Sequence, residues 1–403
     1  MIIHKKVIKK ENIGMVAYTE YTRDPRVRRY SEALIRHGYH VDCFVLKEST
    51  KPVTEIINGV KIHHLNISQY RGVSNFSYII SYLRFFFLAF KALTKNISKN
   101  YSVIHVHNMP DFLVFTTLTN KLFGSKVILD IHDNMPELYK AKFDSKIGVL
   151  LYHILLAQER LSCFYADRVV TVHVPHFEYN VKNHNLSPNK TFIIPNFADT
   201  NLFHPLTETN SVKNGAFNVI YHGTIAERFG LNLILKGIKK VHEDFPFLRL
   251  HIYGKGDGVV NLKTDIQAMD LENIVVYHGQ IELDLIPGKI AESDLGLVTY
   301  IQSDATDLML PLKLMEYMAV GIPALTVINK PIKYYFKTDE LAYYESNNLE
   351  SFTRELLNLI KSPPELSRLQ KKTEIVNQRL NWENEQKNYI NEIQKLTGIQ
   401  TLW

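Results

Sequence analysis

Short runs of β-branched residues alternate with longer helical patterns along almost the whole chain, and this alternation constrains the fold more than any other feature. Strands that alternate with helices of this length form βαβ units and pair in parallel. In the first half, the predicted strands cover residues 13–18, 41–46, 60–65, 103–107, 126–131, 168–172 and 191–194. Predicted helices between them cover residues 31–37 and 147–165.

A second series of the same kind begins after the polar stretch TETNSVKNGA, which is typical of a linker. Its predicted strands cover residues 218–221, 249–253, 274–277, 295–298 and 323–327. A chain of 403 residues also exceeds the usual size of one domain. We therefore expect an α/β protein with two Rossmann-like domains, residues 1–203 and 213–378, followed by a helix in residues 381–403.

The composition excludes several classes of protein. Hydrophobic residues at 45% and charged residues at 22% are ordinary for a folded chain. Cys43 and Cys163 lie far apart without metal-ligand spacing, which argues against a disulfide framework or zinc knuckle and fits a cytoplasmic protein. The net charge of +6 suits nucleic acid, anionic lipid or phosphorylated substrates, but no nucleic-acid-binding motif is present, so no such partner is expected.

The segment LPLKLMEYMAVGIPAL, residues 310–325, predicts a helix over residues 311–320. Pro311 suits a first helical turn, and the sequence Gly321-Ile322-Pro323 provides a stop. Lys313 and Glu316 then share one face near the positive end of the helix dipole. Such a pair could bind a nucleotide diphosphate, with the cation on phosphate and the carboxylate on ribose, or it could be an ordinary surface ion pair.

The same segment resembles the nucleotide-sugar-binding motif of family-4 glycosyltransferases, retaining enzymes of the GT-B fold, whose pattern is P-x-K-x-x-E-Y-M-A-x-G-x-P. The resemblance continues along most of the chain through segments in the family's order: TRDPRVRRYSEALIRHGYHVDCFVL, VIHVHNMPDFL, VILDIHDNMPELY, IIPNFADTNLF, YHGTIAERFGLNLILKGI, LHIYGKGD, VVYHGQI and SDLGLVTY. It implies that Glu316 binds the donor ribose. It also implies two domains that face an interdomain cleft, and a last helix that crosses back to the first domain.

The stretch from Gly223 to Gly230 is expected between a strand and a helix, where free amides can approach a phosphate. Gly223, Thr224 and Arg228 are therefore candidate donor-binding residues. The commonest family pattern has an arginine at the position of Thr224 and a lysine at the position of Phe229. We accordingly assign the diphosphate to Arg228 and Lys313.

Three further donor-side predictions come from loops at strand ends. Asp304 and Asp307 precede the key helix and could bind sugar hydroxyls or cap the helix. The resemblance implies that the backbone from Gly279 to Ile281 borders the nucleobase. The sequence GKGDG lacks the spacing of a dinucleotide-binding motif, so no such cofactor is predicted.

His132 follows a predicted strand of the first domain, with Asp133 and Glu137 close behind it. A lone histidine is usually structural, but the matching histidine of the family approaches the reacting sugar. We therefore predict His132 as a catalytic residue, together with Arg228, Lys313 and Glu316. The carboxylates of Asp133 and Glu137 are expected on the acceptor side.

No resident cofactor and no metal are expected, because the chain lacks an Asp-x-Asp motif at a strand end. Arg228, Lys313 and helix dipoles would neutralise the leaving diphosphate instead. The nucleotide sugar is then a co-substrate. Activity is expected to resist EDTA.

Residues 77–95, SYIISYLRFFFLAFKALTK, predict a helix with Ser77, Ser81, Arg84, Lys91 and Lys95 along one polar stripe. It is judged too short and too charged to span a bilayer. It could be packed inside the domain or lie in a membrane interface. Basic residues of the same half would favour anionic lipid, namely Lys5, Lys6, Lys9, Lys10, Arg26, Arg28 and Arg29.

The reaction that the resemblance implies is transfer of a hexosyl unit from a nucleotide diphosphate sugar, with UDP favoured over GDP, to an acceptor hydroxyl. A bacterial cell-surface polysaccharide or polyprenyl-linked glycan is the expected product, made in the cytoplasm at the inner face of the membrane. Two alternatives stay open. The chain could be a non-catalytic partner subunit, which the missing phosphate-binding cations would suit, or a nucleotide-sugar epimerase.

Overall fold

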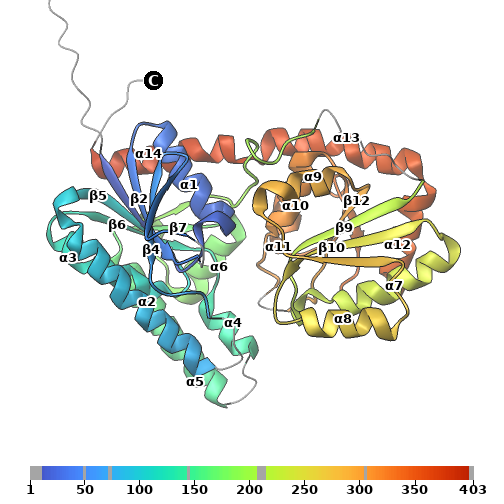
Figure 1. Ribbon diagram of the computed structural model, residues 1–403, viewed down its shortest axis with the longest axis horizontal. Coiled ribbons are helices and arrows are strands. Elements are labelled where there is room, and N and C mark those ends of the chain that lie inside the picture. Colours follow the sequence, from blue (N-terminus) through green and yellow to red (C-terminus); the bar gives the residue numbers. More distant parts are fainter. Residues whose placement is uncertain are drawn as a thin grey trace, which may run out of the picture. The chain divides into compact units, whose positions relative to one another are not determined.

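The computed structural model describes residues 11–48, 51–70, 75–142, 146–206, 215–303 and 306–398. The chain forms two compact units. Unit 1 comprises Met1–Pro195 and Glu385–Trp403, and unit 2 comprises Asn196–Asn384. Each unit contains a largely parallel sheet covered by helices (Figure 1).

Unit 1 contains an eight-stranded sheet in the order β3-β4-β2-β1-β5-β6-β7-β8. The strands are β1 (Asn12–Val16), β2 (His40–Leu46), β3 (Thr54–Ile57), β4 (Val60–Leu65), β5 (Tyr101–His107), β6 (Lys126–Ile131), β7 (Arg168–Thr171) and β8 (Thr191–Ile193). The described pairs are parallel except β3 with β4, an edge hairpin that the sequence analysis did not predict. Its turn is Asn58-Gly59, and both residues have positive φ.

The helices of unit 1 cover both faces of this sheet. They are α1 (Pro25–Arg36), α2 (Asn75–Lys95), α3 (Leu118–Leu122), α4 (Met135–Lys142), α5 (Lys146–Tyr165), α6 (Val174–His184) and most of α14 (Trp382–Thr397), with the 3-10 helix η3 (Asp111–Thr117). Because side chains alternate along a strand, Ile104 and Val106 of β5 join the core under α2, whereas His105 and His107 point to the opposite face. There Tyr30 of α1 and Tyr389 of α14 contact the imidazole of His105.

Unit 2 contains a six-stranded parallel sheet in the order β11-β10-β9-β12-β13-β14. The strands are β9 (Phe217–Thr224), β10 (Leu248–Lys255), β11 (Val275–Gly279), β12 (Leu295–Val298), β13 (Ala324–Val327) and β14 (Ala342–Tyr344). The helices are α7 (Leu231–Asp244), α8 (Val259–Ala268), α9 (Ile286–Ala291), α10 (Leu312–Val320), α11 (Lys330–Tyr335), α12 (Leu349–Lys361) and α13 (Pro363–Arg379).

The boundary between the units lies at Pro195, several residues before the expected end of the first domain. Phe197, Ala198 and Phe203 explain the difference, because all three are buried in the hydrophobic core of unit 2. At the other end of the chain, α14 starts in unit 2 and continues into unit 1 from Glu385. Tyr389, Ile390 and Ile393 of this helix are fully buried.

Candidate active site

Helix α10 is held on the sheet of unit 2 by Tyr317, the residue directly after Glu316, and its position and end depend on two glycines. The Tyr317 hydroxyl donates a hydrogen bond to the Ile220 carbonyl oxygen at 3.2 Å. Gly296 of β12 leaves the space for this ring, since a Cβ at that position would lie 2.4 Å from a Tyr317 carbon. Gly321, with φ +95°, ends the helix as the sequence predicted. Helix α10 is thereby fixed against the middle of β9.

The Lys313 ammonium is a buried cation without a hydrogen-bond partner among the described residues. Its Nζ lies 3.6 Å from the centroid of the Tyr221 ring and 5.2 Å from that of Phe229. Burial lowers the pKa of Lys313 to about 7; Glu316 opposes this shift, and Arg228 adds to it. Two cations close enough to repel each other, one of them unpaired, form an arrangement that an anion would stabilise.

Glu316 lies on the buried side of α10 and is only 4% exposed. Its Oε2 lies 3.3 Å from Nε2 of His222, which precedes Gly223 on β9. Burial, and then Lys313, lower the pKa of His222 to about 3, so this imidazole is neutral at physiological pH. The helix therefore presents one carboxylate and one ammonium beside a neutral imidazole.

The predicted phosphate loop begins later than expected, because β9 extends through Thr224. Gly223 and Thr224 are exposed residues at the end of this strand and pair with Gly254 and Lys255 of β10. A Cβ on Gly254 would lie 1.8 Å from the Gly223 carbonyl oxygen. The glycines of GKGDG thus permit close pairing of two strand ends rather than forming a dinucleotide motif.

Arg228 and Phe229 follow in a short 3-10 helix before α7. Arg228 is exposed, and its guanidinium carbon lies 4.9 Å from the centroid of the Phe229 ring. Phe229, which stands where the family pattern has a lysine, is buried and contacts both cations. Cation–π contacts of this kind hold a positive charge near an aromatic face. The ring therefore helps to place Arg228 and Lys313.

Asp307 does not cap α10. Asp307 instead forms an ion pair with Lys330, with Oδ2 2.8 Å from Nζ, and Pro311 occupies the N-cap position without a side-chain hydrogen bond. Asp304 lies outside the described residues. The loop is anchored by Asn329, whose Nδ2 donates to the carbonyl oxygens of Thr306 at 3.1 Å and Met309 at 2.7 Å.

The predicted base-binding segment leaves the edge strand β11. Gly279, the last residue of this strand, has φ +74°, and nothing lies within 4 Å of where its Cβ would be. Ile281 is half-buried and packs against the core of unit 2. The backbone between these residues therefore borders open space at the end of the sheet.

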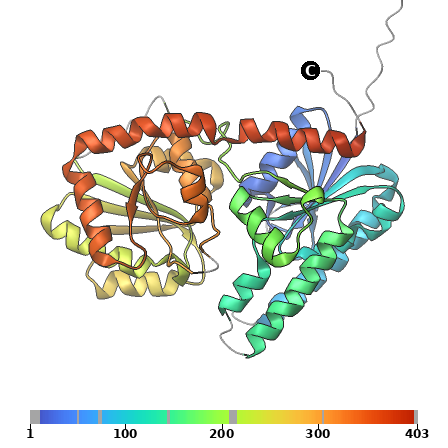
Figure 2. The same ribbon diagram turned by 180° about the vertical axis from the view of Figure 1, so that it is seen from behind.

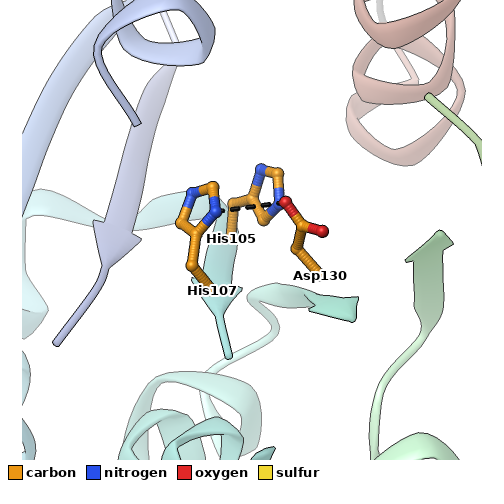
Figure 3. Close-up of side chains that lie close together, drawn as sticks. All are labelled: His105, His107 and Asp130. Atoms are coloured by element: carbon orange, nitrogen blue, oxygen red, sulfur yellow. Dashed lines mark ion pairs between the residues drawn. The ribbon is translucent and has the colours of Figure 1, made fainter. Parts of the chain in front are cut away.

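In unit 1, His132 follows the end of β6 near a cluster of imidazoles around Asp130. Figure 3 shows His105 and His107 of β5 facing the Asp130 carboxylate. Oδ2 of Asp130 lies 3.1 Å from Nδ1 of His107 and 3.6 Å from Nε2 of His105, and Oδ1 lies 3.8 Å from Nδ1 of His132. Although burial raises the pKa of Asp130, the three imidazoles hold it well below its usual value. The carboxylate is therefore ionised and orients the rings around it.

His105, His107 and Asp130 are also the one group of three potential ligands found in the described part of the chain that could hold a metal ion. Their ligand atoms lie within 4.8 Å of one another, and all three side chains are buried. The group belongs to unit 1, whereas Lys313 and Glu316 belong to unit 2.

Arg26 of α1, expected from the sequence to favour anionic lipid, is a basic neighbour of His132. Burial, followed by Arg26, lowers the pKa of His132. Nε and Nη1 of Arg26 are buried and have no hydrogen-bond partner within the described ranges. Nδ1 of His132 is in the same situation. Within the described residues, the Arg26 guanidinium therefore has two donors without hydrogen-bond partners at this edge of unit 1, whereas Nδ1 of His132 lies 3.8 Å from Oδ1 of Asp130.

The two predicted acceptor-side carboxylates have different environments. Asp133 is half-buried, and its backbone carbonyl accepts a hydrogen bond from Asn108. Glu137 is buried and accepts hydrogen bonds from the Tyr179 hydroxyl and from His184 Nε2, both at 2.8 Å. Oε1 of Glu137 is consequently part of an internal network, whereas Oε2 has no hydrogen-bond partner among the described residues, and its acceptor-side role stays a prediction.

Comparisons with known proteins agree with this architecture. The model described as "Glycosyltransferase Family 4" matches residues 26–202, and that described as "Glycosyl transferases group 1" matches residues 207–376. The chain is 20% identical over 348 residues to chitobiosyldiphosphodolichol beta-mannosyltransferase of Debaryomyces hansenii, covering 79% of this chain and 72% of the relative.

Two solved structures share the fold. Sucrose-phosphate synthase of Thermosynechococcus elongatus superposes with a TM-score of 0.78 at 18% identity, covering 96% of this chain and 100% of that structure. HepE of Anabaena, solved in complex with UDP-glucose, superposes with a TM-score of 0.70 at 12% identity, covering 95% and 99%.

Proposed function

We propose that this chain, a glycosyltransferase with a GT-B fold, moves a hexosyl unit from a nucleotide diphosphate sugar bound in unit 2 to an acceptor hydroxyl, with retention of configuration. The observation that carries the proposal is the buried Lys313 ammonium, which has no hydrogen-bond partner in the described residues. Burying an unpaired cation is costly, and a ligand anion removes that cost. The first turn of α10 adds free amides beside it.

In this proposal, Lys313 and Arg228 bind the diphosphate and stabilise it as it leaves. Both cations contact the Phe229 ring, which fixes them before the substrate arrives. Charge stabilisation by fixed groups requires little rearrangement during the reaction. Without cations at positions 224 and 229, Arg228 and Lys313 would supply the positive charge that a leaving diphosphate needs.

Glu316 would accept hydrogen bonds from the ribose hydroxyls. A carboxylate held by α10 and limited in movement by its buried position can receive two hydroxyl donors. Neutral His222, 3.3 Å from Glu316, would help to orient it without neutralising its charge. The backbone from Gly279 to Ile281 would border the base, and Gly223 and Thr224 the phosphates. Asp307 would bind the sugar only after its ion pair with Lys330 is broken.

UDP is proposed over GDP as the donor nucleotide. Support comes from HepE, a structure of the same fold that was solved with UDP-glucose. The diphosphate leaving group would itself take the proton of the acceptor hydroxyl, so that no covalent carboxylate nucleophile is needed. Catalysis would then rest on positioning and charge stabilisation without a metal.

Unit 1 would bind the acceptor. His132, partly exposed and oriented by Asp130, would approach the reacting sugar, and Asp133 would lie on the acceptor side. The Arg26 guanidinium, whose Nε and Nη1 have no hydrogen-bond partner among the described residues, supports an acceptor that carries phosphate. The name of the Debaryomyces hansenii relative describes a diphosphate-linked lipid acceptor, which supports the same class. A lipid-linked or cell-surface glycan made at the inner face of a bacterial membrane is the proposed product.

Thermal shift with UDP- and GDP-sugars tests the donor site, because a ligand that binds only the folded state raises Tm. We expect UDP-sugars to raise Tm in the wild type and not in Glu316→Ala. No shift with any nucleotide sugar would overturn the proposal in favour of a non-catalytic subunit. Incubation with donor alone distinguishes an epimerase, which would convert the sugar without an acceptor. NMR of the product establishes whether the configuration is retained.

A further inference from the structure

Helix α5 has an apolar outward face. Leu150, Ile154, Leu161 and Phe164 are 61%, 54%, 62% and 82% exposed. Their spacing places them on one stripe of the helix, while inward-facing residues such as Leu156 are buried. A helix on the surface of a soluble domain usually carries polar residues on this stripe, whereas no described part of the chain covers the apolar outer face of α5.

Helix α2 has a second exposed apolar face. Every fourth residue from Ser81 is buried against unit 1, namely Ser81, Phe85, Ala89 and Leu93. The polar stripe predicted from the sequence is therefore wrong at Ser81, which faces inward and forms a hydrogen bond with Tyr18 at 2.6 Å. The outward side carries Ile79, Ile80, Leu83 and Phe87, which are 51%, 50%, 44% and 65% exposed.

Helix α3 connects these two faces. The Thr94 and Thr119 hydroxyls are hydrogen-bonded at 2.7 Å, which ties α3 to α2, and Lys121 donates to the Tyr165 carbonyl at 2.7 Å, which ties α3 to α5. Leu122 and Phe123 beside them are each 77% exposed. Figures 1 and 2 show α2 and α5 side by side on unit 1. We call the exposed apolar residues of the three segments the apolar helical surface: Ile79, Ile80, Leu83, Phe87, Leu122, Phe123, Val149, Leu150, Ile154, Leu161 and Phe164.

The charges around this surface favour an anionic partner. Helix α2 contains no acidic residue, and Arg84, Lys91 and Lys95 are exposed along it. The single acidic residue of α5, Glu159, is 2% exposed and lies 2.7 Å from Nδ1 of His184. Arg160 of α5 is exposed. The exposed charges on both helices are thus positive, a pattern that binds anionic lipid in membrane-surface helices.

A polar pocket of about 550 Å³ borders the same surface near the start of α2. Its lining includes Asn66, Gln69, Ser77 and Arg84 together with Ile80 of the apolar helical surface. An apolar face next to a hydrogen-bonding pocket that contains a guanidinium matches the two parts of an anionic lipid, acyl chain and head group.

Two observations show how α2 would meet a bilayer. By length and composition alone, Ser77–Lys95 could cross a membrane, contrary to the expectation from its sequence. Phe85, Ala89 and Leu93 are nevertheless fully buried in the core of unit 1. A helix with one face packed on a sheet cannot also be surrounded by lipid, so it would lie in the interface.

We propose that the apolar helical surface docks unit 1 on an anionic lipid bilayer. The inference deepens the proposed function, from which it takes only the expectation of a membrane-borne acceptor. Among the basic residues named from the sequence, Arg29 is 2% exposed and cannot take part, and the four lysines of the N-terminus lie outside the described residues. Arg84, Lys91 and Lys95 are the better candidates for contacts with lipid head groups.

Vesicle flotation of the full chain tests this proposal. Wild type should float with vesicles of phosphatidylcholine and phosphatidylglycerol, more weakly with phosphatidylcholine alone, and less in high salt. Ile154→Glu/Leu161→Glu should lower the partition coefficient by about tenfold or more, because it places two charges in the interface. The matched control is Val260→Glu/Ile375→Glu, which changes residues 74% and 54% exposed on α8 and α13 and should leave flotation unchanged.

Two further measurements separate the outcomes. Lys91→Gln/Lys95→Gln should weaken flotation with anionic vesicles by about tenfold and leave binding to neutral vesicles unchanged. Light scattering that shows a dimer abolished by Ile154→Glu/Leu161→Glu, without flotation of the wild type, would overturn the proposal in favour of a second copy. Absence of flotation in every lipid would also overturn it. The donor thermal shift should be the same in all these variants, so failure of the proposed function is detected separately.

Discussion

The two units balance the charges at their strand ends in different ways. In unit 1, the ionised Asp130 is surrounded by His105, His107 and His132. Although burial lowers the pKa of His184 in the same unit, two neighbouring carboxylates raise it. In unit 2, Lys313 has no hydrogen-bond partner in the described chain, and Arg228 adds a second positive charge. The carboxylates of unit 1 are thus surrounded by hydrogen-bonding imidazoles, although Nε and Nη1 of Arg26 have no described partner there, whereas in unit 2 the buried ammonium itself has no described hydrogen-bond partner.

This difference indicates which unit needs the more highly charged ligand. A buried charge without a partner costs free energy that the fold must supply from elsewhere, and it is retained where binding or catalysis requires it. A buried charge that has a partner, in contrast, can have a purely structural role. This difference supports the proposal that unit 2 binds the donor diphosphate, and the groups around Asp130 and His184 of unit 1 are expected to act mainly on stability and orientation.

The largest effect is expected for Lys313→Met. Removing the one buried cation of α10 leaves the diphosphate with the exposed Arg228 alone, so kcat/KM should fall by about 10²–10³, or roughly 3–4 kcal/mol. Steady-state kinetics with a UDP-sugar measures this. Lys263→Met is the matched control, because Lys263 also lies over a tyrosine ring, 5.5 Å from the Tyr277 centroid, but is exposed. Equal losses in both variants would contradict the assignment.

A loss of up to about 3 kcal/mol in the free energy of unfolding of unit 1 is expected as the pH rises. Burial lowers the pKa of His184, but Glu137 and Glu159 raise it, and the net change is from 6.5 to about 9. A raised pKa stabilises the folded state fully below pH 6.5, and this contribution is lost as the pH rises through about 9. Urea unfolding across this range should show a decline that is smaller in Glu159→Gln and unchanged in His204→Gln. A flat profile in the wild type would show that His184 is not ionised.

A hundredfold loss of kcat, roughly 3 kcal/mol, is expected for His132→Ala, because general catalysis or orientation by one imidazole has about this size. The donor thermal shift and the far-UV spectrum should be unchanged, since the donor residues belong to unit 2. An unaltered kcat would remove His132 from the site. Asp130→Asn should lower kcat less and shift the pH profile of the rate, because it changes the orientation of His132 without removing it.

The sequence predicted features whose cause is local. Pro311 and Gly321 delimit α10 to within one residue of the prediction, because both act through their own backbone conformation. The hairpin of β3 and β4 could also have been predicted, since Asn58-Gly59 between β-branched residues is the common two-residue turn. The alternation of short β-branched runs with helical patterns likewise predicted most strands of both sheets.

Features that depend on partners distant in the chain could not be predicted. Glu137 is buried because His184, 47 residues later, folds against it. The unpaired state of Lys313 depends on Tyr221 and Phe229, which come from β9 and the loop after it. Ser81 points inward because of the way α2 is rotated about its axis on the sheet. The spacing of apolar residues along the helix does not determine this rotation by itself. Each of these requires the assembled fold.

A smaller and more specific effect is proton uptake during donor binding. The lowered pKa of Lys313, about 7, leaves this amine mostly neutral at pH 8, and a bound diphosphate should restore its charge. Calorimetry in buffers of different ionisation enthalpy should show uptake approaching about one proton per UDP at pH 8 and little at pH 6. Lys313→Arg should bind UDP with no such uptake, because arginine is always charged. Equal uptake in both proteins would assign the proton to another group.

The smallest expected effect is that of EDTA, which tests the proposed donor site of unit 2 and the His105, His107 and Asp130 group of unit 1 in one experiment. Transfer should be unchanged, because Lys313 and Arg228 supply the positive charge that a metal would otherwise bring to the diphosphate. A loss of activity restored by Mg²⁺ or Mn²⁺ would mean that unit 2 is not sufficient by itself. If EDTA instead lowers Tm with activity intact, the ion was held by unit 1, and His105→Gln should abolish that change in Tm because His105 is one of its three potential ligands. A bound cation would then balance the charge of the Asp130 carboxylate in unit 1, in addition to its contacts with the imidazoles.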